Sequence, residues 1–225
     1  MRLEFTIYSS LKGFIQFKIL FLNVSKSYLK VEFLTICILN KMRCFIGIDL
    51  PNSLKKSISK FIDDVDNLNL FYGKFVESEN LHLSLKFLGE LSEEDVSNVE
   101  KSLSTINFNP FKFSIKDIGS FPNKNFVKVL WLGVGEGKKE ILELNNKIEE
   151  NLPQFSNTYK VFTPHITLGR IKNISNKDML SKFFDKNKNI SFGEVNVSSF
   201  YLFKSTLTSN GPIYEKIKKF ELKDK

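Results

Sequence analysis

The stretches HLSLKFLG (residues 82–89) and HITLGR (residues 165–170) contain both histidines of the 225-residue chain. In each stretch the histidine is followed two positions later by a hydroxyl residue, Ser84 or Thr167, and Leu or Ile stands between them. Successive side chains of a β-strand point to opposite faces. The sequence therefore predicts two strands, each with an imidazole and a hydroxyl on one face and apolar anchors directed into the core.

The two stretches belong to a longer internal repeat with an offset of 165 − 82 = 83 residues. The same offset relates Ser92 to Ser175 and Asp95 to Asp178. Ser92 and Asp95 have the spacing of a capping box, which begins a helix. We therefore expect two related halves, each with a histidine-bearing strand that is followed by a helix about ten residues later.

Hydrophobic periodicity divides the rest of the chain into short strands and helices. Apolar or alternating runs predict strands at residues 45–50, 75–76, 81–88, 111–118, 126–134, 161–171 and 192–203, the last as one strand or two. Helical periodicity predicts helices after Pro51, after Ser92, at 140–150 and at 177–184; the pattern at 212–222 suits a helix but leaves that segment ambiguous. Because the order is not a strict β-α-β alternation, we expect the α+β fold class.

The positive charge is unevenly distributed along the chain. The net charge is 33 − 25 = +8, which suits an anionic partner but is weak evidence alone, because most of the cations are lysines. Half of this excess lies in residues 1–41, which contain neither histidine and show no clean period. A domain opening follows at Met42, where a short strand is ended by Pro51. We expect residues 42–225 to form the functional domain and residues 1–41 to be an extra segment, from a translation start assigned too early.

Composition also narrows the compartment and the class of site. Two cysteines, Cys37 and Cys44, argue against a disulfide scaffold and fit a reducing cytoplasm. No apolar stretch approaches the roughly 20 residues that a transmembrane helix needs, and no signal-peptide pattern is present. No Asp, Glu and His cluster has metal-ligand spacing. We therefore expect a cytoplasmic protein that acts as a monomer and uses no metal and no cofactor.

Two imidazoles that meet on one surface can perform acid–base chemistry at phosphorus. A neutral imidazole takes a proton from the attacking water, and a protonated one gives a proton to the leaving ribose oxygen. The hydroxyls of Ser84 and Thr167 can donate hydrogen bonds to the non-bridging oxygens, where charge develops. One His-x-Ser strand is usually structural, but two matched copies that use both histidines favour a catalytic pair.

Residues 42–225 resemble the two-histidine phosphoesterases of the LigT-like class, which include RNA 2′,3′-cyclic phosphodiesterases and 2′–5′ RNA ligases. The resemblance rests on MRCFIGIDLP (42–51), HLSLKFLG (82–89), VLWLGV (129–134), TPHITLGR (163–170), and LFKS (202–205) with GPIY (211–214). It implies a bilobal fold, with two pseudo-symmetric lobes of mostly antiparallel sheet, helices outside, and an active-site cleft between the lobes.

The resemblance also implies the roles of the site residues. His82 would be the proton donor and His165 the proton acceptor, while Ser84 and Thr167 would bind the phosphate. The expected reaction opens a 2′,3′-cyclic phosphate at an RNA 3′ end to a 2′-phosphomonoester. Ser84 departs from the Thr that many members have there, but the hydroxyl is kept.

Three cations are weaker candidates for contacts to phosphate or RNA. Lys86 lies four residues after His82, so simple strand alternation puts the two on one face. Arg170 follows the second motif directly, and the resemblance makes it a phosphate or RNA contact; alternation points it away unless Gly169 allows a bulge. Arg43 is a similar candidate at the domain opening.

Aromatic side chains and the reaction itself leave alternatives open. Phe121, Trp131 and Tyr214 could stack on a base, although a place in the core is the simpler interpretation of each. The same site could join a cyclic phosphate end to a 5′-hydroxyl, as a 2′–5′ ligase, or act on a small cyclic nucleotide. A non-catalytic RNA-binding module is a further alternative, but it would give no reason for a matched acid and base.

Overall fold

The structure is a computed structural model that describes residues 41–155, 162–209 and 211–223. Residues 1–40, nearly all of the segment expected to lie outside the domain, are not among the described residues. The remainder, Lys41–Lys225, forms one compact unit.

This unit contains nine strands, four α-helices and one short 3₁₀ helix within the described residues. Along the chain they are β1 (Met42–Asp49), α2 (Asn52–Asn67), β2 (Phe71–Phe75), η1 (Ser78–Asn80), β3 (His82–Leu91), α3 (Glu93–Leu103), β4 (Phe111–Asn123), β5 (Phe126–Val134), α4 (Lys138–Asn151), β6 (His165–Ile174), α5 (Lys177–Lys186), β7 (Ser191–Val197), β8 (Ser199–Thr208) and β9 (Gly211–Glu221). The α+β class predicted from the sequence is confirmed.

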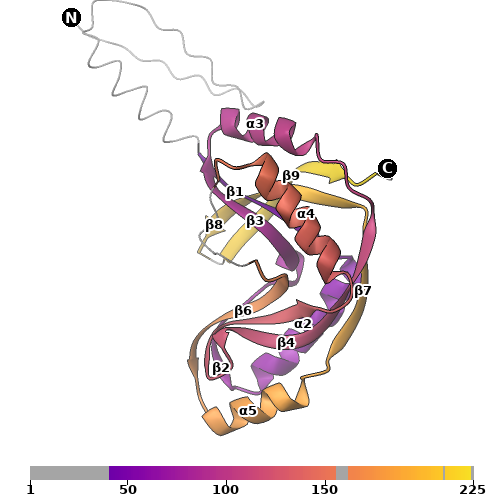
Figure 1. Cartoon of the computed structure of the whole chain (residues 1–225). Helices are drawn as coiled ribbons and strands as arrows, with labels where there is room; N and C mark the ends of the chain where they lie inside the picture. The colour runs from indigo at the N-terminus through magenta and orange to yellow at the C-terminus, as the bar shows by residue number, and fades with distance from the viewer. Residues whose placement is uncertain (1–40, 156–161, 210, 224–225) are drawn as a thin grey trace, which may run out of the picture. The chain divides into compact units, whose positions relative to one another are not determined.

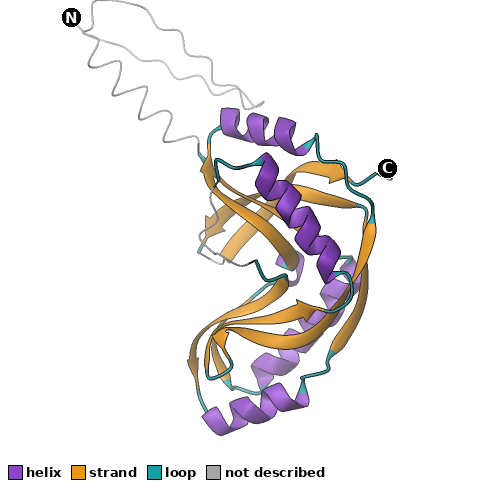
Figure 2. Cartoon of the chain, viewed as in Figure 1, coloured by secondary structure: helices purple, strands orange, loops and turns teal. Residues whose placement is uncertain are grey.

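The strands form one antiparallel sheet in the order β7-β4-β5-β6-β3-β1-β8-β9, and β2 also pairs with β6. Its two halves meet where β3 pairs with β6 through Leu83 and Ile166. The sheet curls at this junction, with α3 and α4 beside the half that contains β1, β3, β8 and β9 (Figures 1 and 2). Helices α2 and α5 lie beside the other half. This is the bilobal, pseudo-symmetric arrangement that the repeat predicts.

The segment 212–222, which the sequence left ambiguous, is a strand. Strand β9 pairs with β8 over nearly its whole length, from Gly211 against Thr208 to Glu221 against Ser199. Its helical spacing of apolar residues is overridden by the long hydrogen-bonded ladder to β8. The run at 192–203 is two strands, β7 and β8, which lie in different halves of the sheet.

Both helices that follow the histidine strands begin where the sequence predicts, at Glu93 and Lys177, but the capping residue of the second is not the one that the repeat predicts. At α3, the Ser92 hydroxyl accepts the Asp95 N–H at 3.1 Å and the Asp95 carboxylate accepts the Ser92 N–H at 2.9 Å, which is the capping box. At α5 the cap is Asn176, not Ser175: the Asn176 side chain accepts from the backbone of Asp178 at 3.0 Å. The helix cap of the second half therefore lies one residue later than the 83-residue offset predicts.

A matched bulge interrupts each histidine strand. Leu85 is the extra residue in β3, because Gly47 and Ile46 of β1 face Ser84 and Lys86. The bulge turns Lys86 to the core side of the sheet, where its ammonium is fully buried and pairs with Glu149 of α4. The expectation that Lys86 shares a face with His82 is therefore wrong, because strand alternation fails across a bulge.

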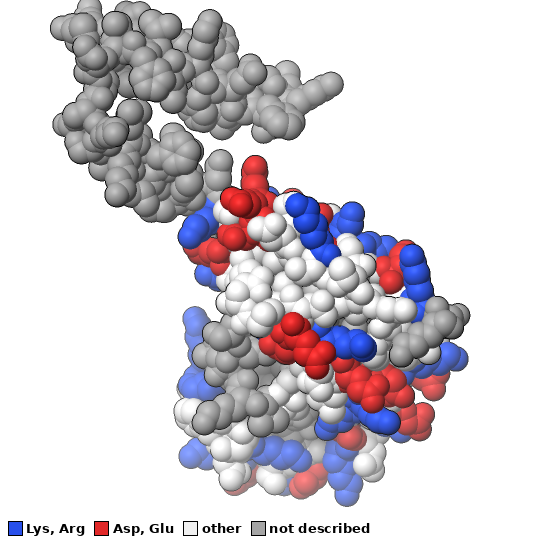
Figure 3. Space-filling view, turned by 45° about the horizontal axis from the view of Figure 1, so that its top comes forward, with Lys and Arg blue, Asp and Glu red and all other residues white. Residues whose placement is uncertain are grey.

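Surface charge is mixed on the face that Figure 3 shows. Lysines and arginines alternate there with acidic residues and do not gather into one continuous basic patch. On this face, charge alone therefore does not mark a binding site for an anion. Among the described residues, none of the helices is both long and apolar enough to cross a membrane.

The buried Lys86–Glu149 pair gives a test of the fold. Glu149→Ala leaves a buried ammonium without its carboxylate, and breaking such a pair costs about 3–5 kcal/mol. We expect a loss of that order in the free energy of unfolding, measured by urea denaturation. Glu143→Ala, which breaks an exposed pair with Lys139, is the matched control and should cost under about 1 kcal/mol. Equal losses in the two variants would contradict this account of the bulge.

Candidate active site

The junction of the two sheet halves brings the histidine motifs together. Because β3 and β6 run antiparallel and pair at Leu83 and Ile166, His82 lies on the Thr167 side of that pair. His165 lies on the Ser84 side. Leu83 and Ile166 are fully buried, whereas both histidines and both hydroxyls are half-buried on the opposite face.

Each imidazole is held by a backbone carbonyl two residues before it. Nδ1 of His82 lies 2.6 Å from the Asn80 carbonyl, and Nδ1 of His165 lies 2.7 Å from the Thr163 carbonyl. A carbonyl only accepts, so Nδ1 is the N–H donor in both rings. Nε2 is therefore the atom of each ring that is left to exchange a proton with substrate. Asn80 and Thr163 are themselves 83 residues apart, so the internal repeat was a signal for this pair of contacts.

The two hydroxyls share the faces of the histidines, as their spacing predicts. Ser84 Oγ lies 2.8 Å from Nε2 of His82. In the neutral ring this nitrogen accepts, so the Ser84 hydroxyl donates the bond. Thr167 is half-buried on β6 beside His165. Ser84, His82, His165 and Thr167 thus form one polar group at the junction.

Burial favours the neutral form of both histidines. It lowers the pKa of His82 to about 4, against a bond from the Asn80 carbonyl that raises it. The charges of Lys55 and His165 lower this pKa further, and Asp49 raises it. Burial also lowers the pKa of His165, partly offset by the Thr163 carbonyl, and the charge of Arg170 adds to the lowering.

Aromatic rings surround each imidazole, so the aromatic candidates do lie at the site. Tyr214 of β9 stands edge-on to His82 with ring centroids 5.2 Å apart, and Phe45 lies 4.8 Å from the same imidazole. In the other half, Phe121 stands edge-on to His165 at 5.0 Å, with Trp131 at 6.1 Å. These rings orient the imidazoles and exclude water from their sides.

The second bulge places Arg170 on the same face of the sheet as the histidines. Leu168 is the extra residue of β6, because Trp131 and Leu130 of β5 face Thr167 and Gly169. Gly169 occupies the position equivalent to Lys86, where a Cβ would lie 2.8 Å from the Phe75 ring. Arg170 is therefore exposed on the histidine face, and its charge acts on both His165 and Tyr214.

Arg43 is not brought to the histidines. It lies six residues along β1 from Asp49, the residue opposite His82, which corresponds to about 20 Å of strand. Its guanidinium is half exposed and lies 3.9 Å from the Glu90 carboxylate. Arg43 is therefore too distant to bind the phosphate that the histidines bind.

A charged cluster beside His82 was missed by sequence reasoning. The Asp49 carboxylate pairs with Lys55 of α2 at 2.7 Å and with Lys216 of β9. These ion pairs, with burial opposing them, hold the pKa of Asp49 below its usual range. Asp49 lies in the stretch that carries the family resemblance, but nothing local distinguishes two lysines among so many. Within the described residues, no three His, Cys, Asp or Glu side chains cluster as metal ligands would.

Comparison with known proteins agrees with this geometry. The family model described as LigT like Phosphoesterase matches twice, at residues 48–131 and 132–214. An RNA 2′,3′-cyclic phosphodiesterase of Methanocaldococcus jannaschii is 39% identical over 183 residues, which cover 80% of this chain and 100% of that protein. One of Archaeoglobus fulgidus, with the same name, is 37% identical over 183 residues, with the same two coverages.

Solved structures show the same fold. A protein of Thermus thermophilus is 27% identical, with a TM-score of 0.66 over 80% of this chain and 98% of that one. Escherichia coli LigT in its apo form is 24% identical, with a TM-score of 0.67 over 82% of this chain and 99% of that one.

The two family-model matches meet between Trp131 and Leu132, so each contains one histidine motif. The chain therefore belongs to the LigT-like phosphoesterase family.

Proposed function

We propose that this protein hydrolyses 2′,3′-cyclic phosphate ends of RNA to 2′-phosphomonoesters by acid–base catalysis between His82 and His165. The observation that carries the proposal is the pair of carbonyl-held imidazoles, both on one face of the strand junction. The names of the archaeal relatives, which match over their full lengths, support the same substrate class.

The proposed step balances with two proton transfers. Nε2 of neutral His165 takes a proton from water as its oxygen bonds to phosphorus. The bond from phosphorus to O3′ breaks, and Nε2–H of protonated His82 gives its proton to O3′. The product carries a 2′-phosphate and a 3′-hydroxyl, and the histidines exchange protons with solvent before the next turnover. Neither transfer needs a metal ion.

Groups on the same face can stabilise the negative charge that develops on the non-bridging oxygens. The hydroxyls of Ser84 and Thr167 can donate to these oxygens, and Arg170 supplies a positive charge nearby. When phosphate displaces the bond between Ser84 and His82, the hydroxyl and Nε2 both become available to the substrate. Attack by an RNA 5′-hydroxyl in place of water would give the 2′–5′ ligase reaction at the same site.

The histidines are the first test of this mechanism. His82→Ala and His165→Ala should each lower the rate on a 2′,3′-cyclic-phosphate oligonucleotide by about 10²–10⁴-fold, because each removes one positioned proton carrier. Product identification, with and without a 5′-hydroxyl RNA, separates hydrolysis from ligation. The control is wild-type enzyme in EDTA, which should stay active. Near-wild-type turnover in either variant would rule out the two-histidine mechanism, and RNA binding without any turnover would favour the non-catalytic module.

The hydroxyls should act mainly on the chemical step. Thr167→Val and Ser84→Ala each remove one donor to a developing charge, which costs roughly 2.7–4 kcal/mol in an oxyanion hole. Steady-state kinetics should therefore show a fall in kcat that exceeds any rise in KM. A change confined to KM would show that these groups bind the ground state only.

The pH dependence follows from the lowered histidine pKa values. A productive free enzyme needs one neutral and one protonated imidazole, and both pKa values lie below the ordinary 6.5. The bell-shaped pH profile of kcat/KM should therefore have its maximum below pH 6.5. Bound phosphate favours imidazolium, so the bell of kcat should lie at higher pH. Initial rates across the acid and neutral range measure both profiles, and a kcat/KM maximum at higher pH than that of kcat would contradict the assignment.

A further inference from the structure

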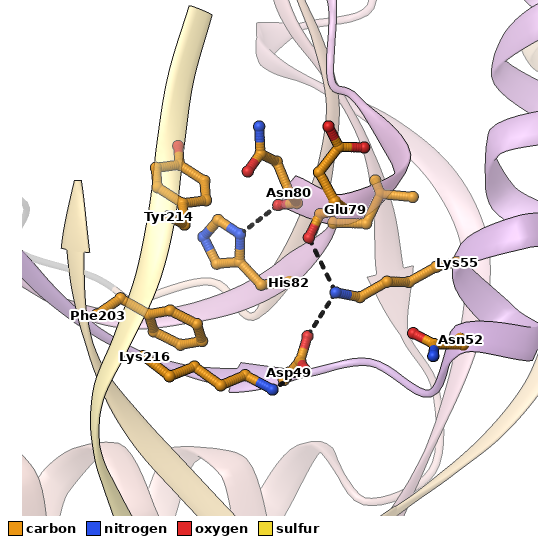
Figure 4. Close-up of a pocket in the computed structure, with 10 residues that line it drawn as sticks. Asp49, Asn52, Lys55, Glu79, Asn80, His82, Phe203, Tyr214 and Lys216 are labelled. Carbon is orange, nitrogen blue, oxygen red and sulfur yellow. Dashed lines mark hydrogen bonds and ion pairs between the residues drawn. The ribbon is translucent and has the colours of Figure 1, made fainter. Parts of the chain in front are cut away.

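A cavity of about 350 Å³ opens beside His82, between α2, η1 and β9. His82, Asn80 and Tyr214 line it on one side, and Lys55, Asp49 and Lys216 line it on the other (Figure 4). Nothing in the proposed hydrolysis step uses this space. It adjoins the histidine that gives its proton to the leaving ribose oxygen.

Two ammonium groups are fixed around this cavity. Lys55 donates to the Glu79 carbonyl at 2.9 Å as well as pairing with Asp49. The Lys216 ammonium pairs with Asp49 and lies 4.5 Å from the centroid of the Tyr201 ring. In Figure 4 the Glu79 carboxylate is turned away from Lys55. Both ammonium groups pair with the same carboxylate, Asp49, so this cluster carries one positive charge that Asp49 does not balance, which favours an anion. Glu79 also lines the cavity and contacts Lys55 through its backbone carbonyl.

The cavity is held open by contacts between distant parts of the chain. Asn80 of η1 is buried, and its side-chain amide donates to the Pro212 carbonyl of β9 at 2.8 Å. This bond fixes the segment that carries Tyr214 and Lys216 over His82. The site is thus organised before substrate arrives, which lowers the entropic cost of binding.

The direction of the reaction identifies which anion lies here. In an in-line displacement the leaving oxygen departs opposite the attacking water, so the ribose lies on the His82 side. The ribose of an RNA 3′-terminal nucleotide carries a phosphodiester at its 5′ position. We propose that the cavity binds this internucleotide phosphate, through Lys216 and Lys55, and so selects RNA ends over free cyclic mononucleosides.

This inference rests on the proposed function, and its test separates the two. Three substrates are compared by kcat/KM: adenosine 2′,3′-cyclic phosphate, its 5′-phosphorylated form, and the dinucleotide ApA with a 2′,3′-cyclic phosphate end. Wild-type enzyme should prefer both 5′-substituted substrates by about tenfold or more, the worth of one charge-assisted hydrogen bond. The 5′-phosphorylated mononucleotide has no second base, so its preference measures the phosphate alone.

Lys216→Met removes one charge and keeps the apolar stem. It should reduce both preferences severalfold or more; because each is a ratio between two substrates, any general loss of activity cancels. Lys204→Met is the matched control: Lys204 of β8 is paired with Glu215 of β9 and does not line the cavity. This variant should keep the wild-type ratios.

The outcomes distinguish the inference from the function. Equal kcat/KM on all three substrates in wild-type enzyme would overturn the cavity assignment and leave the hydrolase intact. A preference for the 5′-phosphomonoester but not for ApA would also overturn it, since the site would then select a terminal phosphate. Unchanged ratios in Lys216→Met would exclude Lys216 as the recognising charge and overturn it. Failure to hydrolyse any of the three would instead refute the proposed function.

Discussion

The pairing of Leu83 with Ile166 is the constraint on which the rest of this structure depends. It joins the two halves of the sheet, and its two residues occupy equivalent positions of the repeat, 83 residues apart. Because both side chains are fully buried, a one-residue slip of either strand would expose a large apolar group and bury an imidazole in its place. The hydrophobic core thus fixes the register, and the register fixes the distance between the histidines. Stability and catalysis are coupled here through one pair of strands.

The two halves share a backbone plan but differ in the side chains that surround each imidazole. Both histidine strands carry a bulge at equivalent positions, Leu85 and Leu168. In β3 the residue after the bulge is Lys86, whose buried ammonium pairs with Glu149 of α4. In β6 that place belongs to Gly169, and the close approach of β2 leaves no room for a larger residue. One half therefore uses its cation for folding, whereas the other exposes Arg170 at the site.

The histidine strands, the presence of most other elements and the repeat could be predicted from local patterns, because each depends on neighbours along the chain. Several boundaries could not: β2 covers 71–75 where 75–76 was expected, and β6 begins at 165, not 161. The position of Lys86 could not, since the bulge that turns it inward is set by pairing with β1. Strand β9 was ambiguous for the same reason: its partner β8 decides its conformation, and its own periodicity suits a helix. The cluster of Asp49, Lys55 and Lys216 joins three elements, and no spacing rule connects them. Local sequence thus predicts the two histidine motifs better than the cluster of charges beside them.

The assignment of acid and base is not determined by the rings alone. Both imidazoles have the same tautomer, held by equivalent carbonyls, and burial lowers both pKa values. What distinguishes them is the space beside each ring. His82 adjoins a cavity that carries two ammonium groups, whereas His165 is enclosed by Phe121 and Trp131. The proposed binding of an anionic RNA strand in this cavity would place the ribose beside His82 and leave the water to His165. In this proposal, a substrate without pseudo-symmetry determines which histidine of the pseudo-symmetric pair acts as the acid and which as the base.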